Sequence, residues 1–129
     1  KTSASNVIIW GMGETVIGGA YDAAVRVVYE SLTAADIRIS IDPDPNKAVW
    51  RKAIVNAGIN PLGALFGIPN GIILESEHLS TVQEMIVREA SLIARLQGLE
   101  IDEKEMIAHV REVCQRTSAN SRATGRCCK

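Results

Sequence analysis

The chain has 129 residues, which is enough for one compact domain and too few for two full ones. Hydrophobic residues make up 47% of it and charged residues 22%, and this composition excludes a disordered or fibrous protein. Fourteen Lys and Arg against fifteen Asp and Glu give a net charge of -1, so neither nucleic acid nor an anionic membrane is an expected partner.

The longest uncharged stretch, residues 53–74, is interrupted by asparagines, prolines and glycines, so we expect no membrane span. The three cysteines contain no C-x-x-C pair, and neither histidine adjoins a cluster of other metal-ligand residues. We therefore expect neither a disulfide framework nor a metal site, and a reducing cytoplasm is the expected location.

The N-terminal part of the sequence indicates a strand, a helix and a second strand. Residues 6–10 (NVIIW) form a short apolar run before a glycine, and residues 36–41 (DIRISI) alternate apolar and polar side chains. Residues 20–34 between them have helical spacing, which predicts parallel strands joined by a right-handed crossover. Two such strands leave edges and a face uncovered, so residues 1–44 are predicted to be the margin of a larger sheet.

A glycine-rich segment, residues 11–19 (GMGETVIGG), follows the first predicted strand. A dinucleotide site needs a strand, a glycine turn and a helix in this order. The third glycine of that pattern would fall on Val16, and Glu14 would place a carboxylate beside the pyrophosphate. We therefore predict an ordinary turn here and place no cofactor at it.

The next predicted helix begins at Asp44-Pro45, which is a typical helix start. It is expected to run to Gly67 with an interruption at Asn60-Pro61, because proline removes a backbone donor. Residues 67–76 are expected to form a loop.

Two further helices are predicted from capping patterns. Thr81 and Glu84 form a capping box for a helix that ends at Gly98, and Asp102 and Glu105 form one for the last helix. The predicted inner face of the first of these helices is the stripe Val82, Met85, Ile86, Ala90, Ile93 and Leu96. The predicted inner residues of the last helix are Met106, Val110 and Val113.

Polar residues recur along one face of the long predicted helix. Lys52, Asn56 and Asn60 lie four positions apart in an otherwise apolar segment, so one ammonium and two amides share a helical face. These groups suit a small keto acid, because an ammonium can pair with a carboxylate or protonate a developing alkoxide while amides form hydrogen bonds. Periodicity alone favours a structural alternative, in which Asn60 caps a segment that begins at Pro61, Asn56 bonds a loop carbonyl and Lys52 is solvated.

Residues 49–71 (VWRKAIVNAGINPLGALFGIPNG) resemble the signature helix of the ketopantoate reductase (2-dehydropantoate 2-reductase) family, which reads W-x-K-x-x-x-N-x-x-x-N-P-L-T-A-L. The residues in register are Trp50, Lys52, Asn56, Asn60, Pro61, Leu62, Ala64 and Leu65. Gly63 stands where the family usually has threonine, and residues 89–102 resemble the family's next helix and turn. The resemblance shifts our interpretation of the polar stripe from structural to functional.

The resemblance implies a mainly α protein with three parts. Residues 1–44 are a short β-α-β unit from the edge of a doubly wound dinucleotide-binding domain, residues 45–120 a truncated helical substrate-binding domain, and residues 121–129 an irregular tail. It also implies that the complete family enzyme reduces 2-dehydropantoate to pantoate, a precursor of coenzyme A, with NADPH. By the resemblance, Lys52 is the proton donor to the substrate carbonyl.

Asn56 and Asn60 match the family's substrate-contacting asparagines. The family's glycine-rich cofactor pattern, however, belongs to an upstream segment that this sequence lacks, and its substrate-binding serine falls on Ala123. We therefore expect the isolated chain neither to hold NADPH tightly nor to turn over the keto acid. The alternative is a non-catalytic oligomerisation or interaction module derived from the family. On either interpretation, uncovered strand edges and helices predict a homo-oligomer.

Overall fold

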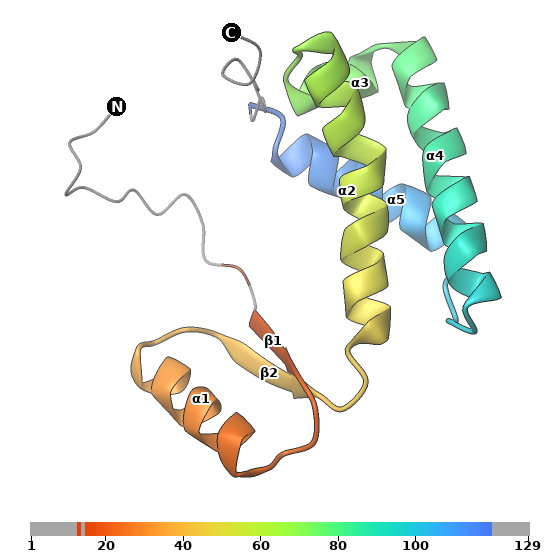
Figure 1. Ribbon diagram of the computed structural model, residues 1–129. Helices are drawn as coiled ribbons and strands as arrows, with labels where there is room; N and C mark the ends of the chain where they lie inside the picture. Colours follow the sequence, from red (N-terminus) through yellow and green to blue (C-terminus); the bar gives the residue numbers. More distant parts are fainter. Residues whose placement is uncertain (1–12, 14, 120–129) are drawn as a thin grey trace, which may run out of the picture. The chain divides into compact units, whose positions relative to one another are not determined.

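The computed structural model describes residues 13 and 15–119. The chain divides into two compact units, Lys1–Pro45 and Asn46–Lys129. Within the described residues the first unit contains two strands and a helix, and the second contains four helices (Figure 1). This order of elements agrees with the predicted fold class, a short β-α-β unit followed by helices.

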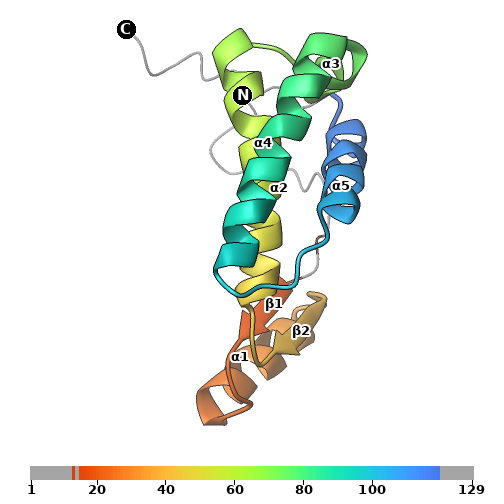
Figure 2. The ribbon, with the colours of Figure 1, turned by 90° about the vertical axis from the view of Figure 1, so that its right-hand side faces the viewer.

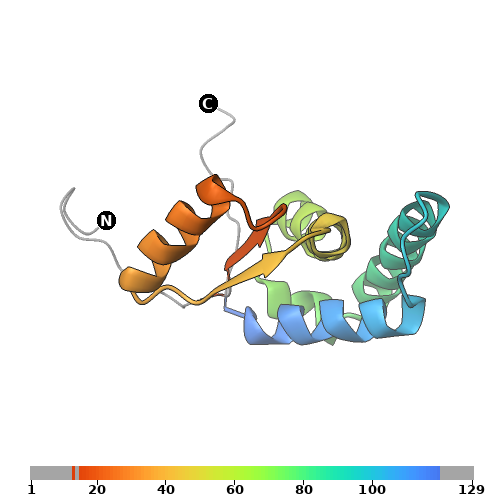
Figure 3. The same ribbon diagram turned by 90° about the horizontal axis from the view of Figure 1, so that it is seen from below.

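The first unit consists of β1 (Thr15–Gly18), α1 (Ala23–Ala34) and β2 (Ile39–Asp42). The two strands are parallel, with Thr15 paired to Ile39, and α1 lies alongside them (Figure 3). The Asp22 carboxylate caps α1 by accepting a hydrogen bond from the Val25 N–H at 2.9 Å. The predicted parallel pairing across a helical connection is confirmed.

The position of the first strand differs from the prediction. β1 lies inside the glycine-rich segment 11–19, which we predicted to be a turn. Thr15, Val16 and Ile17 are all β-branched, and such residues favour extended backbone. The chain turns only at Gly19, whose positive φ of 124° is readily adopted by glycine. The strand predicted at residues 6–10 lies outside the described residues.

The second unit consists of α2 (Asn46–Phe66), α3 (Asn70–Glu75), α4 (Glu77–Leu96) and α5 (Glu103–Arg116). Pro61 lies inside α2, so the predicted interruption at Asn60-Pro61 is wrong. Proline removes one N–H from the helix, but Ile59 and Leu62 on either side of it are buried in the core. Tertiary packing of this kind contributes more to helix stability than one backbone hydrogen bond.

The segment between α2 and α4 is more helical than predicted. It contains α3 where we expected a loop, and α4 begins after Ser76 rather than after Thr81. The Ser76 hydroxyl accepts a hydrogen bond from the Leu79 N–H at 3.4 Å, and the Thr81 hydroxyl donates to the Glu77 carbonyl at 2.9 Å. Thr81 is therefore an interior helical residue, because Ser76 already supplies the cap.

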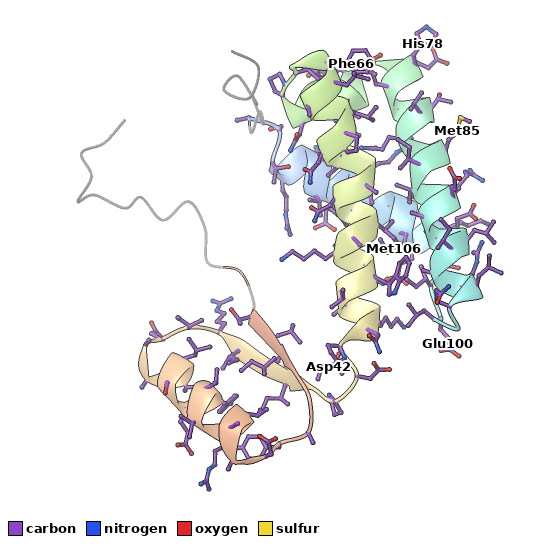
Figure 4. The ribbon with its side chains drawn as sticks, in the orientation of Figure 1. Asp42, Phe66, His78, Met85, Glu100 and Met106 are labelled. Atoms are coloured by element: carbon purple, nitrogen blue, oxygen red, sulfur yellow. The ribbon has the colours of Figure 1, made fainter. Side chains whose placement is uncertain are left out.

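Helix α4 turns a partly different face to the core than predicted: Ile86 and Ala90 of the predicted stripe pack against the core, but the fully buried residues are others. Its buried residues are Gln83, Val87, Ser91 and Ala94. The exposed apolar residues of its opposite side, here called the outer stripe, are Val82, Met85, Leu92, Ile93 and Leu96. Met85 is 63% exposed and points away from the other helices (Figure 4). Small side chains such as Ser91 and Ala94 let α4 approach its neighbours closely, which leaves the larger apolar residues outside.

The core of the second unit lies where α2 packs against α4 and α5 (Figure 2). Its buried apolar residues are Ile54, Ile59, Leu62, Ile73, Val87, Ala94, Ile101, Met106, Val110 and Cys114. The predicted cap of α5 is confirmed, because the Asp102 carboxylate accepts a hydrogen bond from the Glu105 N–H at 2.7 Å. At Gly58 the helices approach closely: an added Cβ would lie 2.9 Å from Cγ2 of Val87 and 3.1 Å from Cγ1 of Val110.

The end of α5 is tied to the beginning of α3. The Gly71 N–H donates to the Ser118 carbonyl at 3.2 Å, and the Asn70 amide donates to the Thr117 hydroxyl at 2.9 Å. An added Cβ on Gly71 would lie 3.0 Å from Cβ of Ser118, so the two backbones are in close contact. These bonds join segments that are 47 residues apart in the sequence.

Candidate functional site

The three polar residues singled out from the sequence lie on one continuous helix, α2. Lys52 and Asn56 are exposed and Asn60 is half-buried. Each residue is about 6 Å further along the helix axis than the one before it, because each step of four residues rises by 1.5 Å per residue. Ile54 and Gly58, which are buried, lie on the opposite side of α2. The helix therefore presents one ammonium and two amides along one face, which is exposed at Lys52 and Asn56 and half-buried at Asn60.

Within residues 15–119, no hydrogen bond or ion pair involves the side chain of Lys52, Asn56 or Asn60. Asn60 does not cap a helix, because α2 continues through Pro61. Asn56 does not bond a loop carbonyl of the described chain. The bonds that the structural alternative gives to Asn56 and Asn60 are thus not formed by described residues, whereas Lys52 is exposed, as that alternative also expects.

Neighbouring cations on α2 differ from Lys52 in their surroundings. The Arg51 guanidinium forms an ion pair with the Glu105 carboxylate at 2.8 Å, which links α2 to α5. Lys47 lines a groove beside the loop between α4 and α5, together with Arg95 and Glu100. Lys52 takes part in neither arrangement, so its ammonium is free to meet an anion or an oxygen on the open face of α2.

Two grooves lined by described residues of the second unit lie away from this face. One is formed by α3, α4 and α5 and is lined by Leu74, Ser80, Ile107 and Arg111, among others. Arg111 is already engaged there, because its guanidinium donates to the Glu84 carboxylate at 2.6 Å. Neither this groove nor the one at Lys47 includes the polar face of α2.

Metal and membrane sites receive no support from the described part of the chain. No group of three His, Cys, Asp or Glu side chains within it is arranged to hold a metal ion. None of its helices has the length and apolar character needed to cross a bilayer. His78 is exposed at the start of α4 (Figure 4), and the His109 imidazole lies 3.9 Å from the Glu112 carboxylate.

A buried polar cluster behind α2 was missed by sequence reasoning. The Gln83 amide of α4 donates to the Gly58 carbonyl at 3.4 Å and lies 3.8 Å from the Cys114 sulfur. The Cys114 thiol donates to the Asn70 carbonyl at 3.0 Å. The positions of Gln83 and Cys114 could have been found only by knowing which face of α4 is buried, because glutamine at a helix surface is the ordinary case.

The Cys114 thiol should make stability depend on alkaline pH. Burial raises its pKa above the ordinary value of 9.0, and the hydrogen bond with Gln83 opposes this only in part. The unfolded chain therefore loses this proton at lower pH than the folded chain, and stability falls once the pH exceeds about 9. We expect Cys114→Ala to flatten this fall by at most about 1.4 kcal/mol per pH unit, measured by urea unfolding at several pH values between about 8 and 10. If the free energy of unfolding fell equally steeply with pH in both proteins, the raised pKa of Cys114 would be contradicted.

A comparison with protein families places the polar face inside a matched segment. The model described as "Ketopantoate reductase PanE/ApbA C terminal" matches residues 44–125. This range contains α2, α3, α4 and α5 and therefore all three residues of the polar face.

Individual proteins agree with the family match. A 2-dehydropantoate 2-reductase of Halobacterium salinarum is 34% identical over 113 residues, which are 85% of this chain and 37% of that protein. The crystal structure of a probable 2-dehydropantoate 2-reductase from Bacillus subtilis has a TM-score of 0.69 at 28% identity, over 86% of this chain and 38% of the other. A ternary structure of D-mandelate dehydrogenase with NADH and anilino(oxo)acetate shares the fold, with a TM-score of 0.78 at 19% identity over 89% and 49% of the two chains. The chain thus spans less than half the length of each of these proteins.

Proposed function

The chain belongs to the ketopantoate reductase family through residues 44–125, and we propose on this basis that it is the substrate-binding part of a reductase that converts 2-dehydropantoate to pantoate. The observation that carries the proposal is the polar face of α2. Lys52, Asn56 and Asn60 follow the family's signature spacing, lie on one side of an unbroken helix and have no bond to another described side chain. Polar groups that share a helix face and have no described partner can bind a ligand through their donors and acceptors.

We propose that Lys52 is the catalytic acid. Its ammonium would donate a proton to the substrate carbonyl oxygen as the carbon is reduced, and this stabilises the negative charge that develops on that oxygen. Asn56 and Asn60 would hold the substrate, since an amide can both donate a hydrogen bond to a carboxylate and accept one from a hydroxyl.

The residues of this chain do not fit NADPH by themselves. The glycine pattern fails at Val16, which lies in β1, and the described part of the first unit is a sheet of two strands. We propose that the cofactor, which supplies the hydride, is held mainly by a dinucleotide-binding part outside this chain. Accordingly, calorimetric titration of the isolated chain should give no NADPH affinity in the micromolar range, which corresponds to about -8 kcal/mol. Micromolar binding would contradict this part of the proposal.

The decisive experiment uses the complete protein. We expect it to oxidise NADPH when 2-dehydropantoate is added, as followed by absorbance, and the isolated chain to show no such turnover. Other 2-keto acids should be tested beside it, because the same ammonium and amides could bind any small keto acid and the fold is shared with a D-mandelate dehydrogenase. Failure of the complete protein on every keto acid would refute the proposed reaction.

The second candidate is a non-catalytic interaction module, and one observation favours it. The outer stripe of α4 exposes five large apolar residues on one helix face, and such patches mark interaction surfaces. We propose that the chain is a homo-oligomer whatever its activity, and that this stripe takes part in the contact. Met85→Glu is then expected to raise the dissociation constant measured by sedimentation by about tenfold or more, because it places a charge in an apolar contact. A well-behaved monomer of the unmodified chain over a wide concentration range would contradict self-association.

A further inference from the structure

The turn of α2 between Asn56 and Asn60, here called the weak turn, lacks one backbone hydrogen bond that a regular helical turn has. Pro61 has no N–H, so the Ala57 carbonyl lacks the donor it would normally use, and the proline ring crowds the turn before it. Gly58, in the same turn, adds the freedom of a residue without Cβ. This turn therefore separates Lys52 and Asn56 on one side from Asn60 on the other.

Gln83 of α4 contacts the weak turn directly. Its side chain is only 1% exposed, and its amide nitrogen donates to the Gly58 carbonyl at 3.4 Å. The absence of a side chain at Gly58 lets α4 lie close to α2 at this turn: an added Cβ would lie 2.9 Å from Cγ2 of Val87, one turn after Gln83 on the same helix. Gln83 thus donates to the Gly58 carbonyl, which follows directly after the Ala57 carbonyl that Pro61 leaves without a donor.

Gln83 is poorly explained as a residue that only stabilises the core. Its amide oxygen is buried and has no hydrogen-bond partner among the described residues. A buried acceptor without a partner lowers stability, and a leucine of similar size would avoid this. Ser91, two turns further along the same face of α4, also has a buried oxygen without a described partner, but no hydrogen bond joins its side chain to α2. Of these two buried polar residues, Gln83 is the one bonded to the weak turn.

We propose that Gln83 is a positioning residue that braces the weak turn of α2 and so fixes Asn60 relative to Lys52. This inference rests on the proposed function, because it assigns Asn60 to the substrate and Lys52 to its carbonyl oxygen. With the brace in place, both groups meet one small ligand in a fixed geometry. Without it, the segment after Pro61 shifts and substrate binding weakens, while the Lys52 ammonium keeps its own place.

The first test asks whether the bond from Gln83 to the Gly58 carbonyl stabilises the weak turn, and it needs no enzymatic activity. In the isolated chain, the Leu62 amide donates to the Gly58 carbonyl if the helix is regular, so its hydrogen exchange reports on the weak turn. Gln83→Leu should raise the exchange rate at Leu62 by about threefold or more relative to other amides of α2, as measured by NMR. Ser91→Ala is the matched control and should leave that ratio unchanged. No change at Leu62 in Gln83→Leu, or the same change in both variants, would overturn the brace.

The second test measures positioning in the complete protein. Gln83→Leu should raise KM for the keto acid by about fivefold and leave kcat within about twofold, whereas Ser91→Ala should alter neither. An unchanged KM together with faster exchange at Leu62 would overturn the positioning role and leave only the brace. If the complete protein reduces no keto acid at all, the proposed function fails, and the exchange experiment still decides whether Gln83 braces α2.

Discussion

Lys52→Ala in the complete protein is expected to lower kcat by about 100-fold or more. The reason is that the Lys52 ammonium interacts most strongly with the carbonyl oxygen when negative charge develops on it, so its loss raises the barrier of the chemical step. Lys52 is exposed and has no ion-pair partner among the described residues, so the substitution should not disturb the fold. Steady-state kinetics measures the effect, and circular dichroism of the variant chain checks the fold.

Lys47→Ala is the matched control for this prediction. Lys47 is also an exposed lysine of α2, but it lines the groove beside the α4–α5 loop instead of the polar face. Its removal should leave kcat within about twofold of the starting value. Asn56→Ala and Asn60→Ala should mainly raise KM, because their amides contact the substrate in its ground state as well. If Lys52→Ala folds normally and keeps its full kcat, Lys52 is not the catalytic acid, and the structural interpretation of the polar face holds.

Gly58→Ala is expected to lower the free energy of unfolding of the isolated chain by about 1–3 kcal/mol. Alanine is intrinsically the better helix former, but the new Cβ would lie 2.9 Å from Cγ2 of Val87 and 3.1 Å from Cγ1 of Val110. Both valines are buried, so neither can move aside without disturbing the packing of α2 against α4 and α5. Urea unfolding at a fixed pH measures the change.

The same substitution five residues further on should have the opposite sign. Gly63 is also a buried residue of α2, but an added Cβ there would lie 3.6 Å from both the Asn70 side-chain oxygen and the Ile68 carbonyl, which is an ordinary contact distance. Gly63→Ala should therefore raise the free energy of unfolding by up to about 1 kcal/mol, through the better helix propensity of alanine alone. If both substitutions changed stability by the same amount, close packing at Gly58 would not be the cause.

The sequence predicted the fold class and the helical face of the candidate site, because both follow from local periodicity and from a motif with defined spacing. Lys52, Asn56 and Asn60 share a face for the simple reason that they are four residues apart on a regular helix. The helix cap at Asp102 was likewise predicted from its spacing to Glu105 in the sequence. Features of this kind depend on a few neighbouring residues.

Features that depend on tertiary packing were predicted wrongly. Helix α4 has two candidate inner faces, and the sequence favoured the more apolar one, whereas the buried face contains Gln83 and Val87, which meet α2 at Gly58. Continuity of α2 through Pro61 depends on the buried residues around it, which no local rule for proline includes. The brace by Gln83 could not be predicted for the same reason, since it requires knowing which face of α4 meets α2.

The tie between α3 and α5 has a consequence for how the second unit forms during protein synthesis. Because Gly71 bonds Ser118, the ribosome must deliver nearly the whole unit before this contact can close. Until then α2 and α4 can pair, but Ile73 and the other residues that α5 covers remain in contact with water. The nascent chain therefore passes through a stage in which the core residues that α5 covers are open to water, and a chaperone that binds apolar segments would find its target there.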